Sequence, residues 1–152
     1  MSDFITDNHI NRTLDVIIIG AGFSGLGMAI QLQQANINNF AILERDKEVG
    51  GCWRDNHYPG AACDIPSNLY SFSFAPNPNW SRAYSSSHEI LDYIKSLVSG
   101  FELQRHIRFN TNVNDIKFDD STGLWIIKTD TKKTGRNKTL KARAVVIASG
   151  PL

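Results

Sequence analysis

Short apolar runs alternate with periodic amphipathic positions along the first part of the chain. A strand-like run occupies Val16–Ile19, and apolar residues at Leu26, Ala29 and Ile30 follow with helical spacing before a second run at 40–43. Runs of this length are typical of buried parallel strands, and the spacing of the apolar residues between them is typical of an amphipathic helix. The pattern therefore predicts a βαβ unit.

The segment 46–87 shows neither the apolar runs of strands nor the helical spacing of apolar residues, and it is rich in Gly, Pro, Asn, Ser and aromatic residues. An irregular segment of this length within a compact domain is usually functional. A helix is predicted directly after it, because Ser86–Glu89 matches a capping box, apolar positions within 90–98 share one face, and Gly100 is a typical stop.

The last third of the chain predicts an antiparallel meander followed by a buried parallel strand. Apolar-rich stretches alternate there with polar turns. The predicted strands are 107–109, 116–118, 124–128 and 139–143, with turns at 119–123 and 131–138. The apolar run 144–148 is predicted as a separate central strand whose tip faces a ligand crevice.

Length and charge exclude some classes of function. The chain has 152 residues, enough for one sizeable core, and 16 basic against 15 acidic side chains leave a net charge of +1. This balance indicates neither nucleic acid nor an anionic membrane as a partner. The basic residues near the end are expected to form a solvated hairpin: Lys132, Lys133, Arg136, Lys138, Lys141 and Arg143.

The N-terminal residues and the two cysteines indicate where in the cell the protein is expected to be located. The first residues lack the basic and apolar regions of a signal peptide, and the apolar runs are strand-sized, so we expect a soluble, cytoplasmic protein. Cys52 and Cys63 match neither the CxxC redox spacing nor a zinc-ligand set. We therefore expect two reduced thiols and no metal site, which argues against a disulfide reductase.

Three glycines directly after the first predicted strand indicate a dinucleotide site. Gly20, Gly22 and Gly25 have the spacing GxGxxG. In this motif the first glycine makes a tight turn, the second lets the backbone approach a pyrophosphate, and the third allows close packing of the helix on the strand. The pyrophosphate is then expected at the positive end of the helix.

An acidic residue ends the second predicted strand. Glu44 lies 19 residues beyond Gly25, where a carboxylate that accepts hydrogen bonds from ribose hydroxyls is expected. A carboxylate here repels a 2′-phosphate, so the ADP half of FAD or NAD is predicted rather than NADP, although Arg45 weakens this exclusion. The alternative is that Glu44 is only a solvated charge at a strand end.

Further motifs extend beyond the glycine loop. Gly50–Trp53 reads GGCW, Tyr58–Asp64 reads YPGAACD, and Ala148–Gly150 reads ASG. Together with Gly20–Gly25 and Glu44, these motifs resemble the N-terminal part of flavin-dependent Baeyer–Villiger monooxygenases and their close class B flavoprotein relatives. The resemblance implies FAD that stays bound, NADPH that reduces it, and a reduced flavin that traps dioxygen as a peroxyflavin. That species oxygenates a ketone, or a soft nitrogen or sulfur.

The resemblance also implies a fold. The expected class is α/β, with a Rossmann-like, glutathione-reductase-like FAD-binding domain at 14–152 after an N-terminal tail at 1–13. This domain is expected to combine a parallel sheet with an antiparallel β-meander.

Site residues follow from the same resemblance, position by position. The positions expected to contact FAD are Gly20, Gly22, Phe23, Ser24, Gly25, Glu44, Arg45, Gly51, Cys52, Trp53, Arg54, Asp55, Asp64, Tyr70, Val113, Ser149 and Gly150. The glycine loop and Ser24 would surround the pyrophosphate and Glu44 the ribose. Residues 52–55 would line the ribityl and flavin parts.

The remaining positions carry more specific roles. Asp64 matches an acid beside the isoalloxazine and the nicotinamide and is the predicted catalytic residue. Tyr70 matches a flavin-side aromatic, and the backbone of Val113 is expected to meet the adenine. Ser149 and Gly150 are expected to close over the cofactor.

Alternatives stay open at several positions. Trp53 and Tyr70 are alternatively core aromatics, and Asp64 alternatively caps a turn. Many ketone-oxidising members carry Arg where Ala62 stands and a larger or β-branched residue where Cys52 stands. The resemblance therefore supports the flavin more firmly than the ketone reaction. An N- or S-oxygenating flavin monooxygenase and a catalytically silent dinucleotide-binding domain stay open.

Other features of that family do not occur in this sequence. They are a second GxGxxG for NADPH, the FxGxxxHxxxW fingerprint, the active-site arginine and the final FAD strand. The chain therefore resembles an N-terminal portion, and we expect most of the NADPH site to lie in the absent part. The isolated chain is expected not to turn over substrate. The sequence indicates neither the substrate nor the oligomeric state.

Overall fold

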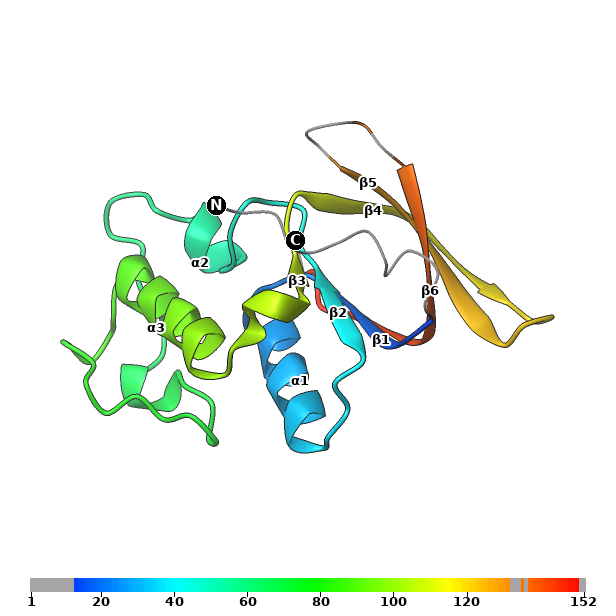
Figure 1. The fold of residues 1–152 in the computed structure, drawn as a ribbon. Coiled ribbons are helices and arrows are strands. Elements are labelled where there is room, and N and C mark those ends of the chain that lie inside the picture. The colour runs from blue at the N-terminus through cyan, green and yellow to red at the C-terminus, as the bar shows by residue number, and fades with distance from the viewer. Residues whose placement is uncertain (1–12, 132–134, 136, 151–152) are drawn as a thin grey trace, which may run out of the picture.

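One six-stranded sheet, in the order β3-β2-β1-β6-β5-β4, organises the fold (Figure 1). The computed structural model describes residues 13–131, 135 and 137–150. The strands are β1 (Leu14–Ile19), β2 (Phe40–Leu43), β3 (Ile107–Arg108), β4 (Thr111–Asp119), β5 (Leu124–Thr131) and β6 (Asn137–Ile147). Its mixed character, parallel around β1 and antiparallel from β6 to β4, confirms the predicted α/β class.

The βαβ unit predicted at the start of the chain is confirmed. The helix α1 (Phe23–Gln34) connects β1 to β2, and the two strands pair in parallel from Val16 opposite Phe40 to Ile19 opposite Leu43. Ile17 and Ile18 are completely buried on opposite faces of the sheet, because successive side chains of a strand point to opposite sides. The apolar run thus serves both cores at once.

The prediction of two separate strands at 139–143 and 144–148 is wrong. β6 runs continuously through both segments, pairing antiparallel with β5 in its first part and parallel with β1 in its second. Ala142 lies opposite both Trp125 and Leu14, so the change of partner takes place there. Residues 139–148 contain no Gly, Pro, Asn or Asp that would break the strand, and a change of neighbouring strand leaves no mark in a single sequence.

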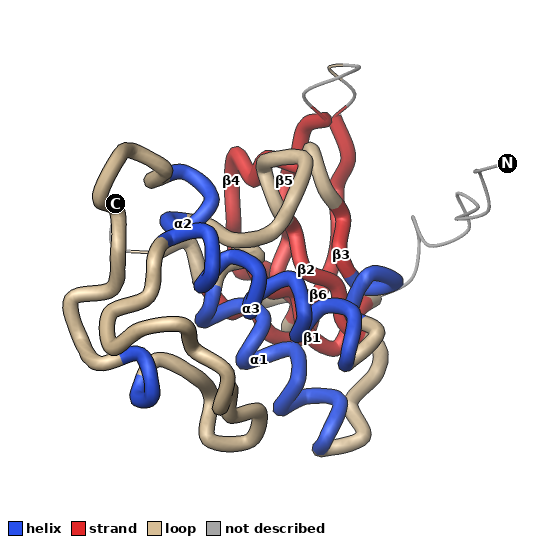
Figure 2. The backbone as a smooth tube through the Cα atoms, turned by 90° about the vertical axis from the view of Figure 1, so that its left-hand side faces the viewer, coloured by secondary structure: helices blue, strands red, loops and turns tan. Residues whose placement is uncertain are grey.

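Two helices cover one face of the sheet, and Figure 2 shows α1 and α3 (Ser87–Gly100) lying side by side in front of it. Their apolar faces form one core with the inner side chains of β1 and β2, whereas the opposite face of the sheet forms a second core. The predicted end at Gly100 is confirmed, with Phe101 as C-cap.

Only half of the predicted capping box forms at the start of α3. Ser86 Oγ accepts a hydrogen bond from Glu89 N at 3.4 Å, as predicted. The Glu89 carboxylate accepts hydrogen bonds from Ser81 N at 2.7 Å and Ser81 Oγ at 2.9 Å rather than from the N-cap amide. These hydrogen bonds lower the pKa of Glu89. Glu89 therefore ties the preceding loop to α3.

The predicted irregular segment contains short helices and is held together by backbone contacts. Its helices are α2 (Cys52–Asp55) and the 3₁₀ turn η2 (Ser67–Leu69). Cys63 N donates to Ser85 O at 2.9 Å and Ser67 N to Ala83 O at 2.7 Å, so residues 62–67 run beside 83–86. The hydroxyl of Tyr93, on α3, accepts from Phe72 N at 2.9 Å and donates to Ala75 O at 2.8 Å.

Some sequence predictions fall outside the described residues. The structure describes only the last residue of the proposed tail at 1–13. In the predicted basic hairpin, Lys132, Lys133 and Arg136 lie outside the described residues. Both stay predictions. Within the described ranges, no helix combines the length and the apolar composition needed to cross a membrane.

We expect one histidine, His106, to make the stability of this fold depend on pH. His106, at the end of the 3₁₀ turn η3 (Leu103–His106), stacks on Phe40 with ring centroids 4.1 Å apart. Its Nδ1 lies 3.2 Å from Phe40 O, and Arg105 Nε donates to its Nε2 at 3.2 Å. Burial lowers the pKa of His106, the hydrogen bond to Phe40 opposes this, and the charge of Arg105 adds to it.

Because the folded protein binds fewer protons at His106 than the unfolded chain does, acid reduces its stability. We expect the free energy of unfolding to fall as the pH drops below the unfolded pKa of about 6.5. His106→Gln should lose less stability than wild type between about pH 7.5 and 5.5, as measured by urea denaturation. Equal losses in the two proteins would contradict this role of His106.

Candidate functional site

The glycine loop joins β1 to α1 at the edge of the sheet where the parallel strands end. Gly20 has a φ of +103°, and a Cβ there would lie 2.5 Å from Ala148 O at the end of β6. A Cβ at Gly25 would lie 1.9 Å from Gly20 O. A side chain at either position would overlap backbone atoms, so the fold itself requires these two glycines.

Gly22 differs from its neighbours in the motif. Its φ is −86°, and a Cβ there would meet only Gly51 Cα, at 3.8 Å. Gly51 has a φ of +53°, and its own Cβ would face Gly22 Cα at 3.4 Å. Two bare stretches of backbone therefore face each other at the N-terminus of α1. The fold does not require a glycine at position 22, so a ligand that lies along this backbone explains it better.

The first turn of α1 is suited to an anion. Its N-cap, Gly22, has no side chain to accept from the free amides, and no acidic residue lies in the first turn. The free N–H groups and the helix dipole favour negative charge at this end. Ser24 is exposed there, whereas the Phe23 ring packs inward, with centroids 5.2 Å from Tyr70 and 5.3 Å from Phe72.

Glu44 is buried beside the glycine loop, so the alternative of a solvated charge is wrong. Its exposed fraction is 4%. Its Oε2 accepts from Ala21 N at 2.8 Å, and its Oε1 accepts from Asp46 N at 3.0 Å and from Arg54 Nη1 at 3.4 Å. A carboxylate offers about four lone-pair positions, so Oε2 keeps one acceptor position for a further donor. The predicted contact with the ribose stays a prediction.

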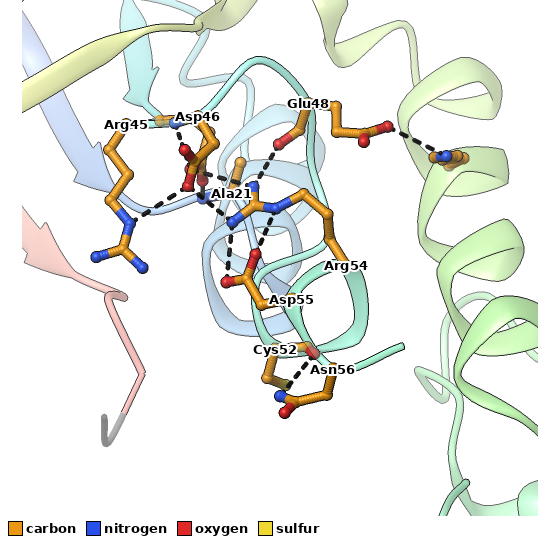
Figure 3. Close-up of polar contacts among 10 residues, drawn as sticks. Ala21, Arg45, Asp46, Glu48, Cys52, Arg54, Asp55 and Asn56 are labelled. Carbon is orange, nitrogen blue, oxygen red and sulfur yellow. Dashed lines mark hydrogen bonds and ion pairs between the residues drawn. The ribbon is translucent and has the colours of Figure 1, made fainter. Parts of the chain in front are cut away.

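Figure 3 shows the side chain of Arg54, on α2, pointing toward Asp46 and Glu48, and its Nη1 also donates to Glu44 Oε1. Its guanidinium contacts Asp46, Asp55 and the Glu48 carbonyl in addition to Glu44. Burial acts to lower the pKa of Arg54, but its hydrogen bond with Asp55 and the charges of the carboxylates outweigh this and raise it. Asp55 was predicted beside the cofactor with Arg54, and in the structure it pairs with that arginine.

Arg45 and Asp46 follow Glu44 in the chain, and only Arg45 is predicted as a site residue from the sequence. Arg45, predicted beside the cofactor, is largely exposed and forms an ion pair with Asp46 Oδ2 at 3.4 Å. Asp46 was not predicted, although it contacts both arginines. An acid three residues after the end of a strand belongs to no known motif, so only the fold reveals this role.

The aromatic residues predicted on the flavin side meet in the structure. Trp53 Nε1 donates to the Tyr70 hydroxyl at 3.1 Å, and the two rings form an edge contact with centroids 5.3 Å apart. Burial raises the pKa of Tyr70, which the hydrogen bond from Trp53 partly offsets. Both side chains are only half-buried, so each keeps surface for a ligand. Cys52, on the same short helix, is exposed.

Asp64, the predicted catalytic residue, is exposed. No hydrogen bond within the described part of the chain involves it, so the alternative that it caps a turn has no support there. Val113 lies at a bulge where the pairing of β4 with β5 shifts between Val113 and Asp115. Ser149 and Gly150 are exposed directly after β6, and Ala148 N donates to Ile19 O at 2.8 Å beside the glycine loop.

One contact that supports the site was missed at sequence level. A Cβ at Gly27 would lie 2.8 Å from Cζ of Phe72, so this glycine lets the ring pack directly on α1. The only signal was an additional glycine two residues after the motif. Neither cysteine forms a disulfide, and the described residues contain no cluster of His, Cys, Asp and Glu that would hold a metal ion.

Known proteins resemble this chain in sequence and fold. A protein named Baeyer-Villiger monooxygenase from Streptomyces coelicolor is 45% identical over 144 residues, which are 95% of this chain and 27% of the relative. An oxidized steroid monooxygenase bound to NADP has a TM-score of 0.85 and 36% identity, over 93% of this chain and 27% of that one. A complex of OTEMO with FAD and NADP has a TM-score of 0.82 and 30% identity, over 91% of this chain and 26% of that one.

These matches confirm the resemblance drawn from the motifs. The chain spans about a quarter of the length of the relatives it matches. A sequence model of the family described as pyridine nucleotide-disulphide oxidoreductase matches residues 17–152. With the glycine loop, the buried acid and the fold in agreement, the chain belongs to this family and is similar to one region of Baeyer–Villiger monooxygenases.

Proposed function

We propose that this chain is the FAD-binding part of an NADPH-using monooxygenase of the Baeyer–Villiger type. The observation that carries the proposal is the bare backbone at Gly22 and Gly51 beside the buried carboxylate of Glu44. A dinucleotide fits this arrangement, with its pyrophosphate at the N-terminus of α1 and its ribose at Glu44. Bound FAD would supply the redox chemistry with NADPH and dioxygen.

The residues of the chain have distinct tasks in this proposal. Gly22 and Ser24 bind the pyrophosphate, and Glu44 accepts a hydrogen bond from the ribose at Oε2. The pair Trp53 and Tyr70 forms the wall beside the flavin, while the exposed carboxylate of Asp64 acts at its reactive edge. The backbone of Val113 meets the adenine, and Ser149 and Gly150 close over the cofactor.

The ketone as substrate is proposed from the relatives alone. The name Baeyer-Villiger monooxygenase of the Streptomyces relative supports it. Oxygenation of a soft nitrogen or sulfur is the second candidate, because Ala62 and Cys52 depart from the residues of many ketone-oxidising members. A cytoplasmic location stays a proposal, which the two free thiols support.

The first experiment tests the flavin and the reaction separately. Purified protein is titrated with FAD and followed by flavin fluorescence, and then given NADPH, oxygen and a panel of ketones and thioethers. We expect FAD binding without product, because hydride transfer requires a nicotinamide held against the flavin, and the sequence has only one GxGxxG loop. Absence of FAD binding would contradict the proposal. Coupled product formation would show that the chain suffices for catalysis.

A second test uses the different roles of the glycines. Gly22→Val should fold, since a Cβ there meets only Gly51 Cα at 3.8 Å, but it should lose FAD binding because the side chain occupies the place of the pyrophosphate. Gly25→Ala is the matched control and should lose about 3 kcal/mol or more of stability. Circular dichroism and FAD titration measure the two effects. Normal FAD affinity in folded Gly22→Val would refute the pyrophosphate assignment.

A third test replaces the carboxylate. In Glu44→Gln, either orientation of the amide points its NH₂ group at a backbone N–H, that of Ala21 or of Asp46. We expect a loss of about 1–3 kcal/mol in stability, and a loss of roughly tenfold to a hundredfold in FAD affinity. Denaturant unfolding and calorimetric titration check the two values. An unchanged dissociation constant would show that Glu44 does not contact the nucleotide.

A further inference from the structure

Arg54 uses its whole guanidinium group within the protein. Its side chain is 11% exposed. Nε donates to Asp55 Oδ1 at 2.8 Å, Nη2 donates to Asp55 Oδ2 at 3.1 Å and to Asp46 Oδ2 at 3.0 Å, and Nη1 donates to Glu48 O at 2.6 Å and Glu44 Oε1 at 3.4 Å. A guanidinium has five N–H donors, and each has a partner here. None is left for a ligand.

The position of Arg54 links two parts of the site. It lies on α2 directly after Cys52 and Trp53, and it reaches back to the end of β2 at Glu44. Gly50 N, just before α2, donates to Ala21 O at 3.0 Å, while Ala21 N donates to Glu44 Oε2. The glycine loop, the carboxylate and the short helix therefore form one closed ring of contacts.

The positive charge of Arg54 offsets the negative charge of the carboxylates around it, which favours the binding of an anionic ligand nearby. Three carboxylates, those of Glu44, Asp46 and Asp55, contact this one cation close to the predicted pyrophosphate position. Without the guanidinium, the buried carboxylate of Glu44 would lack its cationic partner, and the three carboxylates together would repel the phosphates. Arg54 thus holds Glu44 Oε1 in place, while Oε2 is directed at the loop, where it accepts from Ala21 N.

We propose that Arg54 is a positioning residue for the nucleotide: through Glu44 Oε1 it fixes the ribose acceptor and joins it to the helix that carries Trp53. It does not contact the cofactor. This inference rests on the proposed FAD site, and it replaces the direct cofactor contact that the resemblance implied for Arg54. Its consequence is that Arg54 affects binding only while Glu44 carries its carboxylate.

A double-mutant cycle tests this consequence. FAD dissociation constants are measured for wild type, Arg54→Gln, Glu44→Gln and the double variant, at a temperature at which circular dichroism shows all of them folded. We expect Arg54→Gln to weaken FAD binding about tenfold or more when Glu44 is present. In the Glu44→Gln background the same change should weaken binding less than about threefold. Arg143→Gln is the matched control, since Arg143 forms an exposed ion pair with Asp15 and should leave FAD affinity unchanged.

Each outcome decides a different point. Equal weakening in both backgrounds, or unchanged affinity in folded Arg54→Gln, would overturn the positioning role while leaving the FAD site in place. Absence of FAD binding by wild type would overturn both proposals. Should Arg54→Gln not fold, Arg54→Lys takes its place in the cycle, because an ammonium keeps the charge but lacks the fork that reaches several acceptors. The same dependence on Glu44 is expected of it.

Discussion

The close approach of backbone to backbone at the glycine loop is the constraint on which the rest of the structure depends. Gly25 packs against the carbonyl of Gly20, and Gly20 in turn lies against the carbonyl of Ala148. Because none of these contacts leaves room for a Cβ, the start of α1 lies directly against the ends of β1 and β6. The free amides of α1 consequently face the edge of the sheet where parallel strands place ligands.

Burial of Glu44 depends on this geometry and adds a second constraint. A charged carboxylate tolerates burial only when hydrogen bonds and opposite charge replace water. The amide of Ala21 lies within reach only because the glycine loop turns so tightly, and Arg54 lies within reach only because α2 packs behind it. The nucleotide site and the segment expected beside the flavin are therefore stabilised by the same ion pair network.

Much of the fold could be predicted because its signals are local. The run Val16–Ile19, the glycine spacing and the apolar face of α3 each depend on residues close together in the chain, where strand and helix periodicity act. The continuous β6 was not predicted, since Ala142 looks the same whether its partner is Trp125 or Leu14. Glu89 was expected to cap its own helix, and its choice of Ser81 depends on a loop that folds back.

The sequence by itself determined the type of site: three glycines after a strand, an acid after the next strand and the GGCW and YPGAACD motifs indicate a dinucleotide and a family. Only the tertiary structure separated Gly20 and Gly25, which the fold needs, from Gly22, which it does not. It also shows that Arg54 contacts Glu44, a partner that the motifs do not indicate. The reason is physical. Spacing along a chain sets local backbone geometry, whereas the partner of a charged side chain depends on which distant segments surround it.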